Sequence, residues 1–230
     1  MARSFFVGLL ITALTLNTLV GVVKENFVEH NRYVARKATF ALFHEKQFLC
    51  TATAYEHKGN HYKLLTAGHC DVFSDSRDKY NVQNENLINQ KSYPVKILKQ
   101  KRDISSHLDY MILDMETTDK FPIVKIGDSK NIHIGDPLFM VHFGEGIGKQ
   151  QTTGNVATDV MDEASASEDS GQCGLCVERF MATLFGASGS SGAAVIDERT
   201  GKVVGILTGG ISGATLGPMI EPINLFKAEL

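Results

Sequence analysis

The sequence predicts an all-β protein that follows an N-terminal export segment. Its 230 residues include 21 glycines, its apolar runs are short, and few of them repeat with the period of a helix. Hydrophobic residues make up 43% of the chain and charged residues 21%, as in ordinary globular proteins. A chain of this length can bury a sizeable core.

The first 23 residues have the pattern of an export signal. Positive charge in Met1–Arg3 precedes an almost wholly apolar run, Ser4–Val23. The run has roughly the 20 residues that cross a bilayer, and its small-residue cleavage pattern is poor. A cleaved signal peptide over 1–23 and an uncleaved anchor over 4–23 therefore both stay open. Either one predicts a secreted or otherwise extracytoplasmic protein.

Charge and cysteine content narrow the classes of partner and site. The net charge of −3 gives no electrostatic reason to expect nucleic acid or an anionic membrane, so membrane contact is expected only through the N-terminal segment. The four cysteines suit an oxidising compartment. Cys173 and Cys176 form a CxxC that lacks the βαβ context or further ligands of a redox or zinc site. They are expected to form a small structural bridge or to stay unpaired, and no metal or cofactor is expected.

The first half of the chain, 38–120, is expected to form one six-stranded antiparallel barrel. Residues 24–37 are polar and are expected to form a linker, and the polar stretch 71–90 a surface loop. Alternation and β-branched or aromatic content predict strands at Ala38–His44, Phe48–Tyr55, Tyr62–Thr66, Tyr93–Lys99 and Tyr110–Met115.

The second half, 121–230, has a similar pattern. The acidic stretch Met161–Gly174 is expected to be a surface loop, and Pro222–Leu230 a short closing helix. Strand-like stretches lie at Pro137–Phe143, Thr152–Val160, Val177–Leu184, Ala193–Asp197, Val203–Thr208 and Pro218–Ile220.

Three separate stretches carry the residue types of nucleophilic catalysis. TAGHC supplies His69, HLDYMIL supplies Asp109, and GASGSSGAAVID supplies Ser191 among glycines. A serine hydroxyl is a poor nucleophile until a neighbouring base takes its proton, which suits a histidine. A carboxylate then orients the imidazole. The order His69, Asp109, Ser191 is one of the chain orders in which this constellation recurs.

With these motifs the chain resembles the trypsin/chymotrypsin family of serine endopeptidases over roughly Ala38–Asn224. The resemblance implies two six-stranded Greek-key barrels and hydrolysis of peptide bonds in protein or peptide substrates through an acyl-enzyme. In it Ser191 attacks, His69 serves as general base and then acid, and Asp109 orients His69. The backbone N–H groups of Gly189 and Ser191 would form the oxyanion hole.

The resemblance also implies a disulfide and a substrate-binding region. Cysteines at the places of Cys50 and Cys70 are bridged in the family. The residues that correspond to the substrate pocket and the substrate-pairing strand are Phe185, Thr208, Gly209, Gly210 and Gly217. Because Phe185 stands where an acid would select basic side chains, a small or apolar side chain is expected instead of Lys or Arg.

Two serines compete for the role of nucleophile. After Ser191 come a glycine, two alanines and an apolar strand, as in the family, whereas the residues after Ser188 cannot start the strand at the same spacing. The pattern therefore favours Ser191. Ser190 replaces the acid or amide that usually precedes the nucleophile, so activation by pairing that acid with a new amino terminus is not expected. The alternative is a catalytically silent protein that binds peptides or a partner protein with the same cleft.

Overall fold

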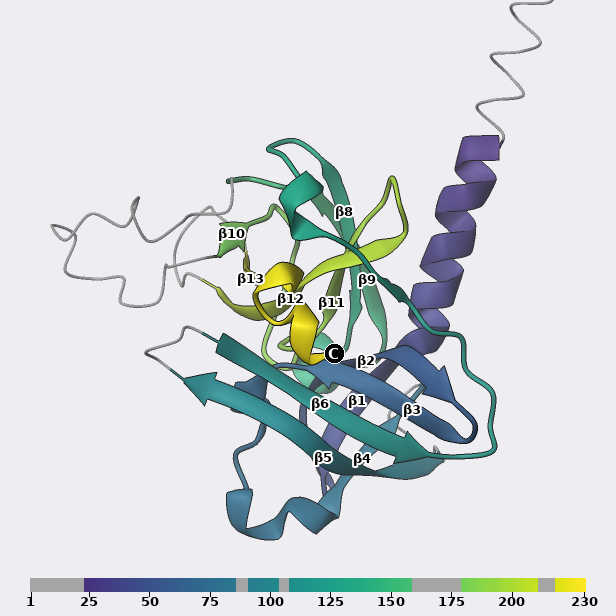
Figure 1. Ribbon diagram of the computed structural model, residues 1–230, viewed down its shortest axis with the longest axis vertical. Coiled ribbons are helices and arrows are strands. Elements are labelled where there is room, and N and C mark those ends of the chain that lie inside the picture. Colours follow the sequence, from purple (N-terminus) through teal and green to yellow (C-terminus); the bar gives the residue numbers. More distant parts are fainter. Residues whose placement is uncertain (1–22, 86–90, 104–107, 159–178, 211–217) are drawn as a thin grey trace, which may run out of the picture.

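The computed structural model describes residues 23–85, 91–103, 108–158, 179–210 and 218–230 (Figure 1). The predicted export segment, except for Val23, lies outside these ranges, as do Cys173, Cys176, Gly217 and the acidic stretch Met161–Gly174. Within the described ranges, no helix combines the length and the apolar character needed to span a membrane.

The first half closes into the expected six-stranded barrel, in the order β1-β2-β3-β6-β5-β4. Each neighbouring pair is antiparallel. The strands are β1 (Thr39–His44), β2 (Gln47–Lys58), β3 (His61–Thr66), β4 (Tyr80–Gln83), β5 (Ser92–Asp103) and β6 (Leu108–Glu116).

Strand β4 corrects the prediction that 71–90 is only a surface loop. Tyr80 and Val82 are buried and alternate with half-buried Asn81 and Gln83, which is the period-2 pattern of a strand with one face in the core. The strand pairs with both β1 and β5. Four residues are too short a pattern to stand out among the surrounding polar residues, yet they complete the barrel.

The second half, where a six-stranded barrel was expected, is a curled seven-stranded sheet. Six strands run in the order β10-β13-β12-β11-β8-β9, and the short β7 (Lys125–Ile126) pairs with β12 in parallel. An isolated bridge between Val156 and Ala182 brings the two ends of the sheet together. The six strands are β8 (Pro137–His142), β9 (Gln150–Asn155), β10 (Phe180–Met181), β11 (Ala194–Asp197), β12 (Lys202–Gly210) and β13 (Pro218–Pro222).

Residues 23–38, which contain the expected linker, form a helix that lies along one side of both halves (purple in Figure 1). Only its last turns meet the core, through Ala35 and Ala38, and Arg32 forms an ion pair with Glu198 of the second half. So small an apolar face leaves no strong helical period in the sequence. The expected closing helix consists of two 3₁₀ turns, η7 (Ile223–Leu225) and η8 (Lys227–Glu229).

A shared core joins the two halves. Buried side chains of the first barrel, such as Phe40 and Tyr110, belong to the same apolar cluster as Phe139 and Ile206 of the second sheet. The ring of Tyr110 stacks on Phe226 near the C-terminus, with ring centroids 4.7 Å apart. The two halves are therefore fixed relative to each other by this shared core, and β1 contacts β8 across the boundary.

A disulfide links Cys50 of β2 to Cys70, as expected. It closes a loop with a sequence separation of 20 that contains β3 and all of β2 from Cys50 onward. Since Cys70 is adjacent to His69, the bond also ties the end of β3 to the barrel wall.

Loss of this disulfide is expected to lower the free energy of unfolding by about 3 kcal/mol, because the unfolded chain regains the entropy of the closed loop. Urea unfolding of the wild type with and without reductant measures the effect. The Cys50→Ala/Cys70→Ala variant should lose the sensitivity to reductant, and a Cys173→Ser/Cys176→Ser variant should keep it. Equal unfolding midpoints for oxidised and reduced wild type would contradict the prediction.

Candidate active site

Asp109 holds the imidazole and the backbone of His69. Asp109 is the second residue of β6, and His69 lies in a 3₁₀ turn, Gly68–Cys70, directly after β3, which pairs with β6. The Asp109 Oδ2 lies 2.6 Å from His69 Nδ1, and Oδ1 accepts the His69 backbone N–H at 2.7 Å. The carboxylate accepts the proton of Nδ1, so Nε2 of the neutral ring is left as the acceptor.

Gly68 allows this turn to form. A Cβ at this position would lie 2.0 Å from the Lys101 carbonyl oxygen of β5, so any other residue would push the strands apart. The Gly68 carbonyl in turn accepts a hydrogen bond from the Gln100 side chain at 2.8 Å. The histidine is therefore presented by a tight turn that is held from both neighbouring strands.

Ser191 lies next to the segment that leads to His69. Its carbonyl accepts the N–H of Thr51 at 2.9 Å. Gly192, with a φ of 82°, leaves no room for a side chain, because a Cβ would lie 2.1 Å from Thr66 Oγ1 and 2.7 Å from Ala67 N. The second sheet thus places Ser191 against the end of β3. In the described part of the chain no hydrogen bond joins its hydroxyl to His69; in unliganded enzymes such bonds are often long.

Ser188 is held elsewhere. Its N–H donates to Glu145 Oε1 at 3.2 Å, and its carbonyl accepts the Glu145 N–H at 2.7 Å. Glu145 belongs to the connection between β8 and β9. Of the two candidate serines, Ser191 therefore adjoins the segment that leads to His69, whereas Ser188 contacts Glu145.

Two backbone donors flank Ser190. The N–H of Ser190 closes a turn onto the Ala187 carbonyl at 2.9 Å, and Gly189 occupies the third position of that turn with a φ of 84°. A Cβ on Gly189 would lie 2.2 Å from the Phe48 ring. Among the described residues, neither the Gly189 nor the Ser191 N–H donates to a protein acceptor. Donors without a protein acceptor are what an oxyanion hole requires.

Ser190 makes a buried hydrogen bond that the sequence did not reveal. Its Oγ lies 2.8 Å from His142 Nδ1, and both residues are fully buried. Burial lowers the pKa of His142 to about 4, so the ring is neutral at physiological pH. His142 lies on the apolar strand β8, and nothing in the sequence relates it to Ser190, 48 positions away.

Glu221 is a second buried group that sequence reasoning missed. Its Oε2 accepts the Asp109 N–H at 2.9 Å, and Arg179 lies 3.9 Å from the same oxygen. Burial, together with the charge of Asp109, raises the pKa of Glu221 to about 8 although Arg179 opposes the shift. The only available signal was a lone acid in the otherwise apolar stretch Pro218–Pro222.

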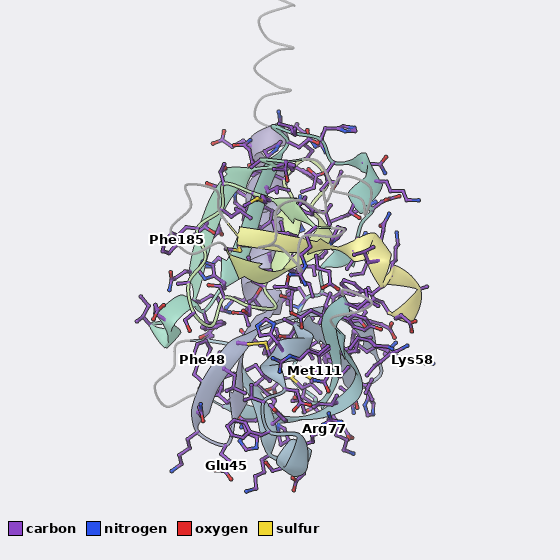
Figure 2. The ribbon with its side chains drawn as sticks, turned by 90° about the vertical axis from the view of Figure 1, so that its left-hand side faces the viewer. Glu45, Phe48, Lys58, Arg77, Met111 and Phe185 are labelled. Atoms are coloured by element: carbon purple, nitrogen blue, oxygen red, sulfur yellow. A yellow bond between two sulfur atoms is a disulfide. The ribbon has the colours of Figure 1, made fainter. Side chains whose placement is uncertain are left out.

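The end of β12 offers an open edge beside the site. Pairing of β11 with β12 ends at Ala194 and Ile206, whereas on its other side β12 pairs with β13 through Gly210. Thr208 and Gly209 therefore extend past β11 with one edge unpaired in the described part of the chain. Phe185 is 64% exposed on the surface of the second half (Figure 2).

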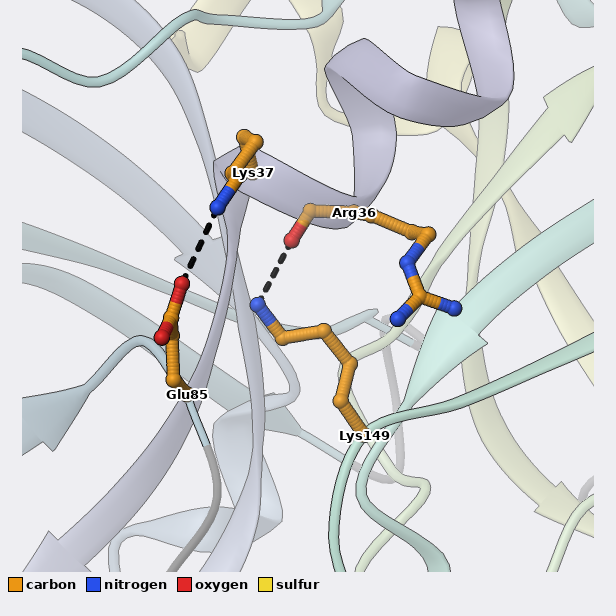
Figure 3. A pocket seen from close by; sticks show the side chains of 4 residues that line it. All are labelled: Arg36, Lys37, Glu85 and Lys149. Carbon is orange, nitrogen blue, oxygen red and sulfur yellow. Dashed lines mark hydrogen bonds and ion pairs between the residues drawn. The ribbon is translucent and has the colours of Figure 1, made fainter. Parts of the chain in front are cut away.

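A cavity of about 210 Å³ lies away from these residues, between the helix and the β8–β9 connection (Figure 3). Its lining residues are Arg36, Lys37, Glu85 and Lys149. Lys149 Nζ donates to the Arg36 carbonyl at 2.6 Å, and Lys37 pairs with Glu85. Burial lowers the pKa of Lys149 to about 7. None of the four residues is among those that the sequence analysis assigns to catalysis or substrate binding.

Comparisons with known proteins identify a family model and similar folds. The family model of the trypsin-like peptidase domain matches residues 50–206. A comparison with curated protein sequences finds no match.

Solved structures with a similar fold include two of the HtrA-type protease AlgW, one with a tripeptide and one with a decapeptide. The first has a TM-score of 0.66 and 17% identity, over 86% of this chain and 60% of that one. The second has a TM-score of 0.66 and 16% identity, over 86% and 64%. A serine endoprotease from Yersinia pestis has a TM-score of 0.64 and 17% identity, over 87% and 64%. The chain thus spans about three fifths of the length of these structures, and identities this low show the fold alone.

The buried Glu221 should make stability fall as pH rises. Its pKa is raised in the folded state, so its contribution is fully present below about pH 4.5 and is lost as pH rises through about 8. Within that window the slope should reach up to about 1.4 kcal/mol per pH unit. Glu221→Gln keeps an oxygen for the Asp109 N–H and should flatten the slope. Urea unfolding between pH 5 and 9 measures it.

The matched control for this prediction is Glu116→Gln at the exposed end of β6. It removes a surface carboxylate and should keep the wild-type pH dependence. Parallel curves for the wild type and Glu221→Gln would contradict the prediction.

Proposed function

The chain belongs to the trypsin-like peptidase family, and from that premise we propose that it is a serine endopeptidase that hydrolyses peptide bonds through an acyl-enzyme. The single observation that carries the proposal is that Asp109 forms hydrogen bonds with both the ring and the backbone N–H of His69. With Nδ1 bonded to Asp109, Nε2 is left to act as the base, and Gly192, next to Ser191, adjoins the end of β3 that leads to His69.

In the proposed reaction, His69 Nε2 takes the proton of the Ser191 hydroxyl as the oxygen attacks the carbonyl carbon of the substrate. Asp109 stabilises the imidazolium that forms. The oxyanion receives hydrogen bonds from the N–H groups of Gly189 and Ser191, and each such donor typically contributes about 2.7–4 kcal/mol to transition-state stabilisation. His69 then donates its proton to the leaving amine, and water hydrolyses the acyl-enzyme by the same route.

We propose that a peptide substrate binds as an added strand along Thr208–Gly210. The edge of β12 beyond β11 supports this, because an unpaired edge offers backbone groups to an extended peptide. Two of the similar structures contain a tripeptide or a decapeptide, which is consistent with a peptide ligand here. Phe185 and Gly217 would line the side-chain pocket.

We also propose that the peptidase works outside the cytoplasm. The support is the disulfide between Cys50 and Cys70, which persists in oxidising compartments, together with the apolar run Ser4–Val23. Whether that run is cleaved or stays as an anchor can be determined by N-terminal sequencing of the mature protein.

A second candidate is a catalytically silent member of the family that binds peptides or a partner protein with the same cleft. The observation in its favour is that no hydrogen bond joins the Ser191 hydroxyl to His69 in the described part of the chain. The two candidates differ in one measurable property, which is the reactivity of the serine.

Wild-type protein should react covalently with a serine-directed fluorophosphonate at Ser191, because the reagent needs an activated hydroxyl and an oxyanion hole. Ser191→Ala should abolish the labelling and lower kcat for a peptide substrate by about 10⁶-fold, as loss of the nucleophile does in other serine proteases. Ser188→Ala is the matched control and should still be labelled. If the wild type is labelled and Ser188→Ala is not, Ser188 is the nucleophile and the assignment of Ser191 is wrong. If the folded wild type is not labelled, the catalytically silent binder is favoured.

Cleavage of a peptide library should concentrate after small or apolar side chains. The reason is that Phe185 supplies no negative charge to the pocket, so a Lys or Arg side chain would lose water without gaining an ion pair. Mass spectrometry of the products gives the profile, with Ser191→Ala as the blank. A profile dominated by Lys or Arg would overturn the pocket assignment.

A further inference from the structure

We propose that His142 is a positioning residue for the oxyanion donors: its unprotonated Nδ1 holds the Ser190 side chain and, through Ser190, the loop that carries Gly189 and Ser191. The inference rests on the proposed peptidase function. His142 lies on β8 and contacts Ser190, in the loop that carries Ser191. It belongs to none of the three stretches that supply His69, Asp109 and Ser191.

The hydrogen bonds around His142 determine its tautomer. The backbone N–H of Gly144 donates to Nδ1 at 3.1 Å, and an N–H can donate only to a nitrogen that carries no proton. Nδ1 is therefore an acceptor, and the Ser190 hydroxyl, 2.8 Å from the same nitrogen, is the donor. The neutral ring must then carry its proton on Nε2.

Ser190, held by His142, in turn fixes the backbone of the turn that begins at Ala187. While its hydroxyl donates to His142, its oxygen accepts the Ala187 N–H at 3.0 Å. The Ser190 N–H returns to the Ala187 carbonyl at 2.9 Å. Two reciprocal bonds thus close the turn from Ala187 to Ser190, which contains Gly189 at its left-handed position. The directions of the N–H groups on either side of Ser190 follow from this turn.

The surroundings of the pair are closely packed. Ser190 and His142 are both 0% exposed. Even a methyl group on Gly144 would lie 3.0 Å from Ser190 Oγ and 3.1 Å from the His142 ring. Loss of either partner leaves the other buried polar group without this hydrogen bond, which costs free energy and favours a rearrangement of the loop.

A packing role alone does not account for an imidazole at this position. In the described part of the chain His142 Nε2 is buried without a hydrogen-bond partner. An apolar ring of similar size would fill the same space without an unpaired N–H group. The feature that only the imidazole supplies here is the acceptor Nδ1, which receives Gly144 and Ser190.

The test compares variants that remove the acceptor or the donor with one that keeps the acceptor. His142→Leu removes Nδ1, Ser190→Ala removes the hydroxyl, and His142→Asn places an amide oxygen where Nδ1 stood. Val141→Ala, also buried on β8, is the matched control for lost packing. Each variant is assayed with a peptide substrate, and kcat is expressed per folded molecule.

Ser190→Ala and His142→Leu should each lower kcat by about 10²-fold with an unchanged KM, because oxyanion donors act mainly in the transition state. The double variant should fall no further than the single ones, since the two residues act as one unit. His142→Asn should recover most of the activity, and Val141→Ala should keep wild-type kcat. Equal losses in His142→Leu and His142→Asn, or wild-type kcat in Ser190→Ala, would overturn the inference.

A spectroscopic measurement tests the pair without relying on turnover. In the wild type, ¹⁵N resonances of the His142 ring should show a bare Nδ1 and a protonated Nε2 at neutral pH, and a protonated Nδ1 would overturn the inference. If the wild type neither cleaves peptides nor reacts with the fluorophosphonate, the proposed function fails and this inference with it. If it does both while the variants keep full kcat, this inference alone fails.

Discussion

The close approach of the Gly192 backbone to the end of β3 is the contact on which the rest of the site depends. Without a Cβ, Gly192 lies against Thr51, Thr66 and Ala67, and so a loop of the second sheet adjoins the turn that presents His69. The glycine also adopts a φ of 82°, which residues with a side chain rarely do. Replacing it would add steric and backbone strain at the point where the two halves of the molecule have to meet.

On the first-barrel side of this contact, the disulfide and Asp109 keep His69 in place. Both carboxylate oxygens of Asp109 bind His69, and the Asp109 N–H donates to Glu221. On the second-sheet side, Ser190 and His142 hold the loop that carries Ser191. Two buried ionisable side chains, Glu221 and His142, thus hold residues of the site. Burial favours the uncharged form of both.

The strands of the first barrel were largely predictable because they are long enough to show alternation, and β1, β2, β3 and β6 lie where the pattern put them. The four-residue β4 and the helix over 23–38 were not, since each buries only a few side chains among many polar ones. The second half was predicted as a barrel by resemblance, and its seventh strand, β7, consists of only two residues. Such short elements are decided by their neighbours in space, because their own sequence contains too few residues to show a period.

The sequence by itself determined which residue types are available for chemistry and in what order, because His69, Asp109 and Ser191 stand in local motifs of glycine, small residues and strand starts. The local spacing after the two serines was enough to favour Ser191. Only the tertiary structure decided which buried side chains contact the residues around the site. Glu221 meets Asp109, and His142 meets Ser190, across separations of 112 and 48 positions. A hydrogen bond between distant residues leaves no trace in local composition or period, since it depends on how whole strands pack.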